Sequence, residues 1–371
     1  MKRRDFLRSS ALSAILAGVG TTIPGALSAR DRKTATSKEV DEIPPYKNFT
    51  FPSSGKFKIL QLTDTHYIKG DPRSRRALEN VTEMIQMERP DLIIHTGDII
   101  FGTPAQESAL EILQPLVDSG IPFAVALGNH DSDFGIERGR MYELVRSLPG
   151  NINTPPKEGL TGFSNDIITL GSPEGRKWVF YLFDSGNMIT IDGHWWYDYV
   201  HFDQVAWYRK ESERIRSENG GVPVPAIAFM HIPPKEYEQV SRENGRQIIG
   251  NFCEEPCTSD FNSGLVCSMK EMGDVEAIVC GHDHDCDYVM RKGPMSYIYG
   301  RFSGCDTVYN NLGRSGARVF EFTLGEEGFR TWVRLWGGAI EQDIFIRKDF
   351  EHMHEVEKLE MKRRFPAPEQ Q

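Results

Sequence analysis

The sequence lacks an apolar run long enough to cross a membrane and lacks any dense patch of basic residues. The apolar stretch at residues 11–20 is shorter than the roughly 20 residues that a membrane-spanning helix needs. With 43 Lys and Arg against 53 Asp and Glu, the chain has a net charge of -10 at pH 7. We therefore expect no stable membrane span. We also expect no nucleic-acid partner, because binding to a phosphate backbone depends on basic patches.

Cysteine is scarce, and its spacing does not form a zinc motif. There are six cysteines: Cys253, Cys257, Cys267, Cys280, Cys286 and Cys305. Cys253 and Cys257 lack a second nearby Cys or His pair that would complete a tetrahedral zinc site. These two residues, in a loop rich in Glu, Pro and Ser, are the best candidates for oxidation, whereas Cys280 ends an apolar strand and is expected to be buried.

The first residues have the composition of an export signal. Basic residues, including Arg3 and Arg4, precede the apolar stretch, and small residues at 26–29 offer a cleavage site. The order Arg3-Arg4-Asp5 followed by Phe and Leu resembles a twin-arginine signal. We expect residues 1–29 to be a signal peptide, with a retained anchor as the alternative. Its removal would change the net charge from -10 to -13 and leave a periplasmic or extracellular protein.

Strand-like and helix-like segments alternate through the first half of the chain, which predicts an α/β fold with a parallel central sheet covered by helices. The expected strands there are residues 57–62, 91–95 and 122–127. The second half is richer in strands, and a charged amphipathic helix is expected at 203–218. We place one domain at residues 55–347, after a polar linker at 30–54 and before a charged tail at 348–371.

Five short motifs rich in Asp, His and Asn lie far apart in the chain, and most of them follow an expected strand. They are Asp64-Thr65-His66, Gly97-Asp98, Gly128-Asn129-His130-Asp131, Met230-His231 and Gly281-His282-Asp283-His284. Side chains at the carboxyl ends of neighbouring strands meet at one edge of a sheet, so we expect these motifs to converge. Their mixture of carboxylate, imidazole and amide groups suits Fe, Mn or Zn rather than Mg or Ca alone.

The series D-x-H, G-D, G-N-H-D, H and G-H-x-H resembles the calcineurin-like metallophosphoesterase superfamily over residues 56–325. This resemblance implies a β-sandwich of two mixed sheets flanked by helices, in four α/β/β/α layers, with a site for two metal ions at one sheet edge. The implied ligands are Asp64, His66 and His284 for the first metal, Asn129, His231 and His282 for the second, and Asp98 as a bridge between them.

Within the superfamily the chain is most similar to a purple acid phosphatase-like branch, but it departs from that branch at one position. Phe101 stands three residues after Asp98, where purple enzymes carry a metal-bound Tyr. The resemblance implies that His284 coordinates the first metal instead, so we expect no tyrosinate colour.

The chemistry implied by this site is the hydrolysis of phosphate esters by in-line attack of a hydroxide that bridges the two metals. His130 is the candidate general acid for the leaving group, with Asp131 orienting its imidazole; a purely supporting role for His130 is the alternative. We therefore expect a secreted phosphoesterase with two divalent or mixed-valence transition-metal ions, acting on a small-molecule phosphate ester. A phosphodiesterase or nucleotidase of the same fold, or a non-catalytic metal- or phosphate-binding protein, are the alternatives.

Four further features are weaker candidates for functional residues. His95 lies within an apolar strand and is expected to be a hydrogen-bonded core histidine. The aromatic run His194-Trp195-Trp196-Tyr197 either contacts substrate or packs over the sheet. Arg301 either binds a phosphate oxygen or forms a structural salt bridge. Asn262, in a turn before the last motif, either contacts substrate or only shapes the turn.

Overall fold

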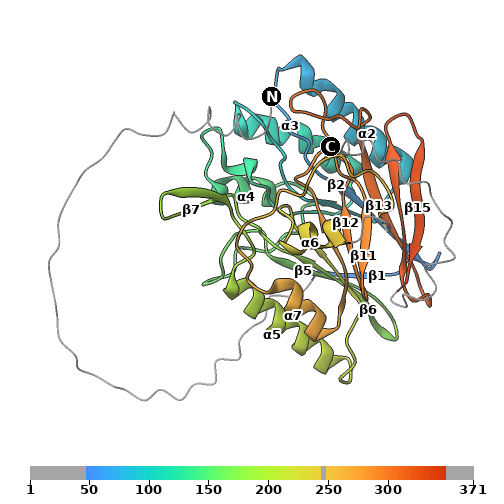
Figure 1. The fold of residues 1–371 in the computed structure, drawn as a ribbon. Helices are drawn as coiled ribbons and strands as arrows, with labels where there is room; N and C mark the ends of the chain where they lie inside the picture. The colour runs from blue at the N-terminus through green and yellow to red at the C-terminus, as the bar shows by residue number, and fades with distance from the viewer. Residues whose placement is uncertain (1–46, 244–247, 348–371) are drawn as a thin grey trace, which may run out of the picture. The chain divides into compact units, whose positions relative to one another are not determined.

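Two mixed β-sheets form the centre of this computed structural model, which describes residues 47–243 and 248–347 (Figure 1). The seven-stranded sheet has the order β1 (Lys47–Thr50), β5 (Asp166–Ser172), β6 (Gly175–Leu182), β9 (Ala226–Phe229), β10 (Val275–Cys280), β12 (Met295–Tyr299) and β11 (Val289–Lys292). The six-stranded sheet has the order β15 (Ile340–Ile346), β14 (Phe329–Leu335), β13 (Gly316–Thr323), β2 (Lys56–Leu62), β3 (Leu92–His95) and β4 (Phe123–Val125).

Helices cover the outer face of each sheet. Apolar side chains of α2 (Arg75–Glu88), α3 (Ala105–Ser119) and α4 (Arg138–Arg146) share a buried cluster with the six-stranded sheet. Those of α5 (Phe202–Glu218), α6 (Glu236–Glu243) and α7 (Leu265–Met272) do so with the seven-stranded sheet. A third cluster, with members such as Ile94 and Phe229, lies between the sheets. The expected α/β/β/α layering is confirmed.

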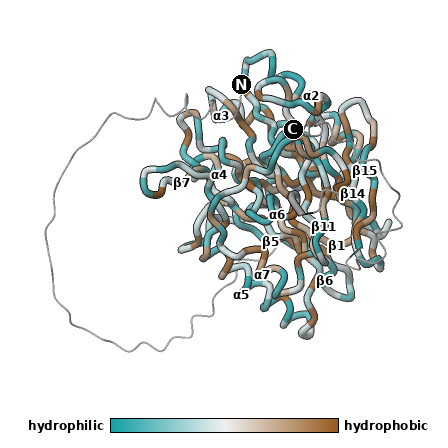
Figure 2. Tube along the Cα trace, in the orientation of Figure 1, coloured by the Kyte–Doolittle hydropathy of each residue, from teal (hydrophilic) through white to brown (hydrophobic). Residues whose placement is uncertain are grey.

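The amphipathic pattern of these elements explains the layering. In α2 the residues at helical spacing, such as Ala77, Val81 and Met84, are buried, while the rest of the helix is largely polar. Central strands such as β3 and β9 are hydrophobic on both faces because each sheet is covered on either side. Figure 2 shows many hydrophilic residues along the outer helix α2 and a mixture of hydrophobic and hydrophilic residues along β14, whose sequence alternates.

Parallel strands occur in both sheets and give each one an edge where carboxyl ends meet. In the six-stranded sheet β2, β3 and β4 are parallel, with Leu60 opposite Ile93. In the seven-stranded sheet β6, β9 and β10 are parallel, with Ile278 opposite Ala228. The alternation in the first half of the chain predicted a parallel sheet covered by helices, and β2, β3 and β4 are parallel as expected. The antiparallel strands of the second half extend one sheet through β13 and complete the other.

The predicted linker at residues 30–54 is wrong at its C-terminal end. Strand β1 lies within it and pairs in parallel with β5, placing Phe49 opposite Leu170. Phe49 also packs edge-on against Phe57 at 5.5 Å between ring centroids, which anchors a strand of otherwise polar composition. The predictions for residues 1–29 and 348–371 lie outside the described residues. Within the described ranges, no helix has both the length and the apolarity to traverse a membrane.

Candidate metal centre

The seven predicted ligands come together at the carboxyl ends of five strands. Their order along the fold is Asp64 and His66 after β2, Asp98 after β3, Asn129 after β4, His231 after β9, and His282 and His284 after β10. Each of the seven is at most 4% exposed to solvent. Burial of so many polar groups is costly unless they are paired or bind metal ions, so this cluster requires compensating partners.

Three of these residues form the first cluster. Asp64 Oδ1 lies 3.7 Å from Nε2 of His66 and 3.6 Å from Nε2 of His284. The two Nε2 atoms are only 2.9 Å apart. The ligand atoms of all three lie within 4.8 Å of one another, a spacing at which one cation can contact each of them.

The second cluster is built from Asp98, Asn129, His231 and His282. Nε2 of His231 lies 3.0 Å from Oδ1 of Asn129 and 3.2 Å from Nδ1 of His282. Asp98 connects the two clusters, because its Oδ2 is 3.3 Å from Nε2 of His231 and 3.5 Å from Nε2 of His66. One carboxylate oxygen therefore faces both groups of ligands.

In two of the histidines, a hydrogen bond to a backbone carbonyl determines which ring nitrogen faces the metal centre. Nδ1 of His231 is 2.7 Å from the carbonyl oxygen of Thr96, and Nδ1 of His284 is 3.1 Å from that of Tyr309. Because a carbonyl only accepts, Nδ1 carries a proton in each ring, and the inward Nε2 is the nitrogen that would coordinate a cation. Metal-binding histidines have this arrangement, in which a backbone oxygen orients the ring.

The electrostatics of the centre favour cations. Burial opposes the ionisation of Asp98, but His231 and His130 outweigh it and hold the pKa of its carboxyl well below its usual range. Burial is likewise outweighed at Asp64, where a hydrogen bond with His66 and two further histidines lower the pKa. For His231, burial disfavours the imidazolium, yet Asp98 raises its pKa to about 9. Ionised, buried carboxylates beside imidazole nitrogens, whose protons a cation would displace, are a donor set that fits transition-metal ions.

The backbone is strained at four of the seven ligands. Among the described residues, eight that are not glycine have a positive φ, and four of them are Asp64, His66, Asp98 and His282. Such conformations cost of order 1–3 kcal/mol each and persist where the surrounding structure holds them. Here they accompany the turns that bring these four ligands together just beyond the strand ends.

Two glycines in the motifs allow the ligand loops to approach one another. A Cβ atom on Gly128 would lie 2.2 Å from Oδ1 of Asp98. A Cβ atom on Gly281 would lie 2.0 Å from Oγ1 of Thr63 and 2.7 Å from Oδ2 of Asp64. The motifs contain Gly at these positions because any side chain would push two ligand loops apart.

His95 lies buried beneath the centre, as expected for a core histidine. Its Nδ1 accepts the backbone N–H of Gly97, and its Nε2 is 3.2 Å from Oγ1 of Thr65. Burial lowers the pKa of His95 to about 4, so the ring is neutral. It connects the loops that follow β2 and β3 and thereby helps to position Asp64 and Asp98.

The structure corrects the predicted partner of His130. Nδ1 of His130 lies 2.8 Å from Oδ2 of Asp133, so Asp133 and not Asp131 orients the imidazole. The carboxylate of Asp131 instead accepts the backbone N–H groups of Asp98, Ile99 and Gly128 at 3.0, 2.7 and 2.7 Å. Three converging backbone donors occupy this carboxylate, which therefore holds the loops after β3 and β4 together. The spacing His-x-x-Asp was a signal for the correct partner.

Aromatic rings border the centre. Phe101 packs edge-on against His66 and His130, at 5.0 and 4.9 Å between ring centroids, and supplies no ligand atom. Tyr309 stacks on His284 at 4.5 Å, and Tyr197 meets His282 edge-on at 4.5 Å. The position three residues after Asp98 thus carries an apolar ring that borders the centre.

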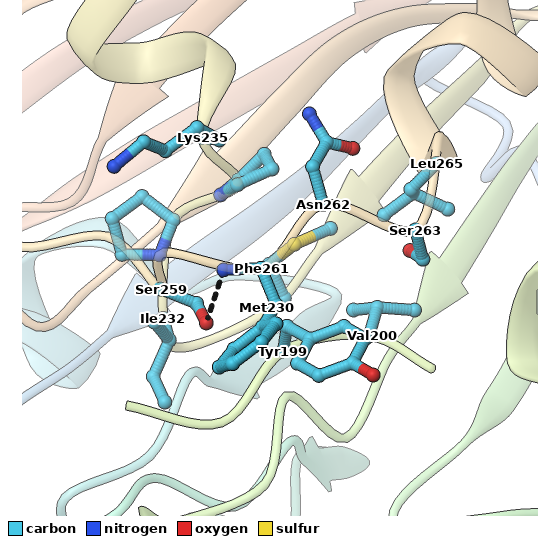
Figure 3. Close-up of a pocket in the computed structure, with 12 residues that line it drawn as sticks. Tyr199, Val200, Met230, Ile232, Lys235, Ser259, Phe261, Asn262, Ser263 and Leu265 are labelled. Carbon is cyan, nitrogen blue, oxygen red and sulfur yellow. Dashed lines mark hydrogen bonds between the residues drawn. The ribbon is translucent and has the colours of Figure 1, made fainter. Parts of the chain in front are cut away.

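Two other predicted candidates lie away from the ligands. Arg301 is 2% exposed, donates to Oδ2 of Asp287 at 2.6 Å and contacts the carbonyl of Arg314, so it forms a structural salt bridge. Asn262 lines a small pocket with residues such as Phe261 and Lys235 (Figure 3). None of the seven ligands lines that pocket.

Comparisons with known proteins agree with the family that the sequence motifs resemble. The chain matches the family model for the calcineurin-like phosphoesterase over residues 57–286. It is 33% identical to the "Probable inactive purple acid phosphatase 28" of Arabidopsis thaliana, covering 77% of this chain and 82% of that protein. It is 25% identical to the "Phosphatase DCR2" of Saccharomyces cerevisiae, covering 81% of this chain and 56% of that protein. A dimetal phosphatase from Danio rerio has a similar fold, with a TM-score of 0.54 at 12% identity over 79% of this chain and 99% of that one.

Proposed function

Because this chain belongs to the calcineurin-like phosphoesterase family, we propose that it hydrolyses small phosphate esters with two transition-metal ions held by its seven clustered ligands. The observation that carries the proposal is the position of Asp98. Its Oδ2 faces Nε2 of His66 in one cluster and Nε2 of His231 in the other, as a bridging carboxylate must. Asp64 and His284 would complete the first site, and Asn129 and His282 the second.

The seven ligands would bind the metal ions, and His130 with Asp133 would transfer the proton. When bound, two such cations lower the pKa of coordinated water toward neutrality and neutralise the oxygens of a phosphate. His130 borders the ligands and is 21% exposed in its side chain, so a leaving group can reach it. Asp133 accepts from Nδ1 of His130 and stabilises the imidazolium, which lets Nε2 hold the proton that the leaving oxygen needs.

The names of some relatives support a second candidate, a protein that binds metal or phosphate without turnover. Three relatives from Arabidopsis thaliana are called probable inactive purple acid phosphatases. In this chain, however, the ligand clusters and the contact between His130 and Asp133 are all present. The intact machinery favours hydrolysis, and a diesterase or nucleotidase with the same centre is tested by the same assay.

The test is metal analysis of the purified protein, followed by hydrolysis of an aryl phosphate and its diester with Mn, Fe or Zn. We expect Asp98→Asn to lose bound metal and to lower kcat/KM by about 100-fold or more, since changes at outer residues alone cost 10–100-fold. Asp118→Asn, on the outer face of α3, is the matched control and should behave as wild type. Equal metal content and activity in wild type and Asp98→Asn would remove the bridging role.

A further inference from the structure

A two-stranded hairpin stands beside the metal centre and belongs to neither main sheet. Strands β7 (Met188–Ile191) and β8 (His194–Tyr197) pair with each other alone and are joined by Asp192 and Gly193. Both turn residues have positive φ, 52° and 74°, as the tight Asp-Gly turn of a hairpin requires. Figure 1 shows β7 projecting from the body of the domain beside α4.

The base of this hairpin is fixed to the loops that carry the ligands. On one side, Nδ2 of Asn187 donates to Oγ of Ser132 at 2.7 Å, two residues after His130. On the other, the ring of Tyr197 meets the ring of His282 at 4.5 Å, and the Tyr197 carbonyl accepts from Oγ of Ser259 at 2.7 Å. An isolated hairpin is marginally stable, so these contacts are what hold it over the centre.

The register assigns the hairpin's side chains to two faces. Directly opposed residues lie on the same face, and faces alternate along each strand. Tyr197 therefore shares its face with Met188, Trp195 and Thr190, whereas Ile191 and Trp196 lie on the other. Trp196 is packed against Phe261, at 6.1 Å between ring centroids. One face of the hairpin therefore carries both Tyr197, whose ring contacts the predicted ligand His282, and Trp195. Trp195 lies about 7 Å farther along the strand, at 3.3 Å per residue.

This face is apolar, aromatic and open to solvent. Trp195 is 61% exposed, an unusual position for the largest side chain. Residues 188–197 contain no Lys or Arg and one carboxylate, Asp192, at the turn. The nearby Lys235 pairs with Glu238 and Asp260, at 3.0 Å each. The hairpin is therefore suited to a neutral, planar group rather than to a second phosphate.

We propose that the Tyr197–Trp195 face of the hairpin binds the leaving group of the ester, and that the substrate class is a phosphate ester of an aromatic alcohol. This inference rests on the proposed function, because it places the phosphate at the metal ligands and the leaving group along the adjoining face. Ring stacking on Trp195 would add about 0.5–1.5 kcal/mol beyond the area buried, which corresponds to about a two- to tenfold preference.

The experiment compares phenylphosphonate with methylphosphonate, which are not hydrolysed, by calorimetry on the metal-loaded full chain. We expect Trp195→Ala to reduce the preference for phenylphosphonate about two- to tenfold, and Trp195→Phe to retain most of it. Ile191→Ala, on the opposite face of the same hairpin, is the matched control and should keep the full preference. The kcat/KM ratio of phenyl phosphate to glycerol phosphate should follow the same order.

The outcomes separate this inference from the proposed function. An unchanged preference in Trp195→Ala, an equal loss for both phosphonates, or an equal effect of Ile191→Ala would overturn the role of the hairpin. If the loaded wild type binds phosphonates with the expected order but hydrolyses no ester, the proposed turnover fails and the aromatic face stands. If neither phosphonate binds but esters are hydrolysed, the role of the hairpin fails and the proposed function stands; if no ester is hydrolysed either, both proposals fail.

Discussion

At the scale of single residues, the centre depends as much on acceptors of backbone N–H groups as on ligands. The Asp131 carboxylate is fully buried and accepts three backbone N–H groups from the loops after β3 and β4. Burial, followed by the nearby charge of Asp98, raises the pKa of Asp131, so its ionised form depends on those donors and on Arg138. Asp133, in contrast, is partly exposed and touches the ring of His130.

These two aspartates should respond differently to the same substitution. Asp131→Asn replaces an acceptor oxygen by an NH₂ group facing backbone donors, so it should lower the free energy of unfolding by about 1–3 kcal/mol and reduce bound metal. Asp133→Asn should leave metal content and stability unchanged but lower kcat and move its pH profile, because it weakens support of the His130 imidazolium. Denaturant unfolding, metal analysis and kcat against pH separate the two.

His130→Ala provides the reference for that comparison. Loss of general-acid help should lower kcat by about 10² to 10⁴ with metal retained. An Asp133→Asn variant that is fully active, beside an Asp131→Asn variant that is stable but slow, would return the orienting role to Asp131.

The sequence could identify the ligand residues but not all of their supports. Asp64, His66, Asp98, Asn129 and His231 are visible because each follows an apolar strand, and strand ends converge in α/β folds. The partner of His130 depends on the short helical turn His130–Ser132, which gives Asp131 and Asp133 different partners, and no strand pattern reveals that turn.

At the scale of elements, the loops after β2 and β10 are brought together by a glycine. Gly281→Ala should separate them, because its Cβ atom would overlap Oγ1 of Thr63 and approach Asp64. We expect lower thermal stability together with at least tenfold weaker metal binding, since the first site takes ligands from both loops. Gly220→Ala adds a side chain into open space, although at a positive φ that Gly281 does not have, so it should cost about 1 kcal/mol and leave metal affinity unchanged.

The length and composition of the strands explain which of them could be predicted from the sequence. Strands β2, β3 and β10 were predicted because each has a run of mostly apolar, β-branched or aliphatic side chains. Strand β1 and the hairpin of β7 and β8 were missed, because each has only four residues and lies at an edge or outside the main sheets. The Asp192-Gly193 pair, between short alternating segments, was a usable hairpin signal.

At the scale of the whole molecule, each proposed metal site takes ligands from both sheets. The loops of the six-stranded sheet supply Asp64 and Asn129, and those of the seven-stranded sheet supply His284 and His282. Elsewhere the sheets are held together by the apolar cluster between them. At the edge that carries the predicted ligands, the buried side chains are carboxylates and imidazoles instead of apolar groups. Bound cations would therefore connect the two halves of the sandwich at its most polar edge.

Metal removal should consequently lower the stability of the entire domain. A ligand present at 100 times its Kd stabilises the folded state by about 2.7 kcal/mol per site. For a domain of this size, 1 kcal/mol corresponds to about 2–4 °C in Tm, so chelation should lower Tm by about 5–10 °C per site. Differential scanning calorimetry with and without chelator, and with restored Mn, Fe or Zn, measures the shift. Asp98→Asn, which lacks the bridge, should show a much smaller shift than Asp118→Asn, and an identical Tm for loaded and chelated wild type would contradict metal ions joining the sheets.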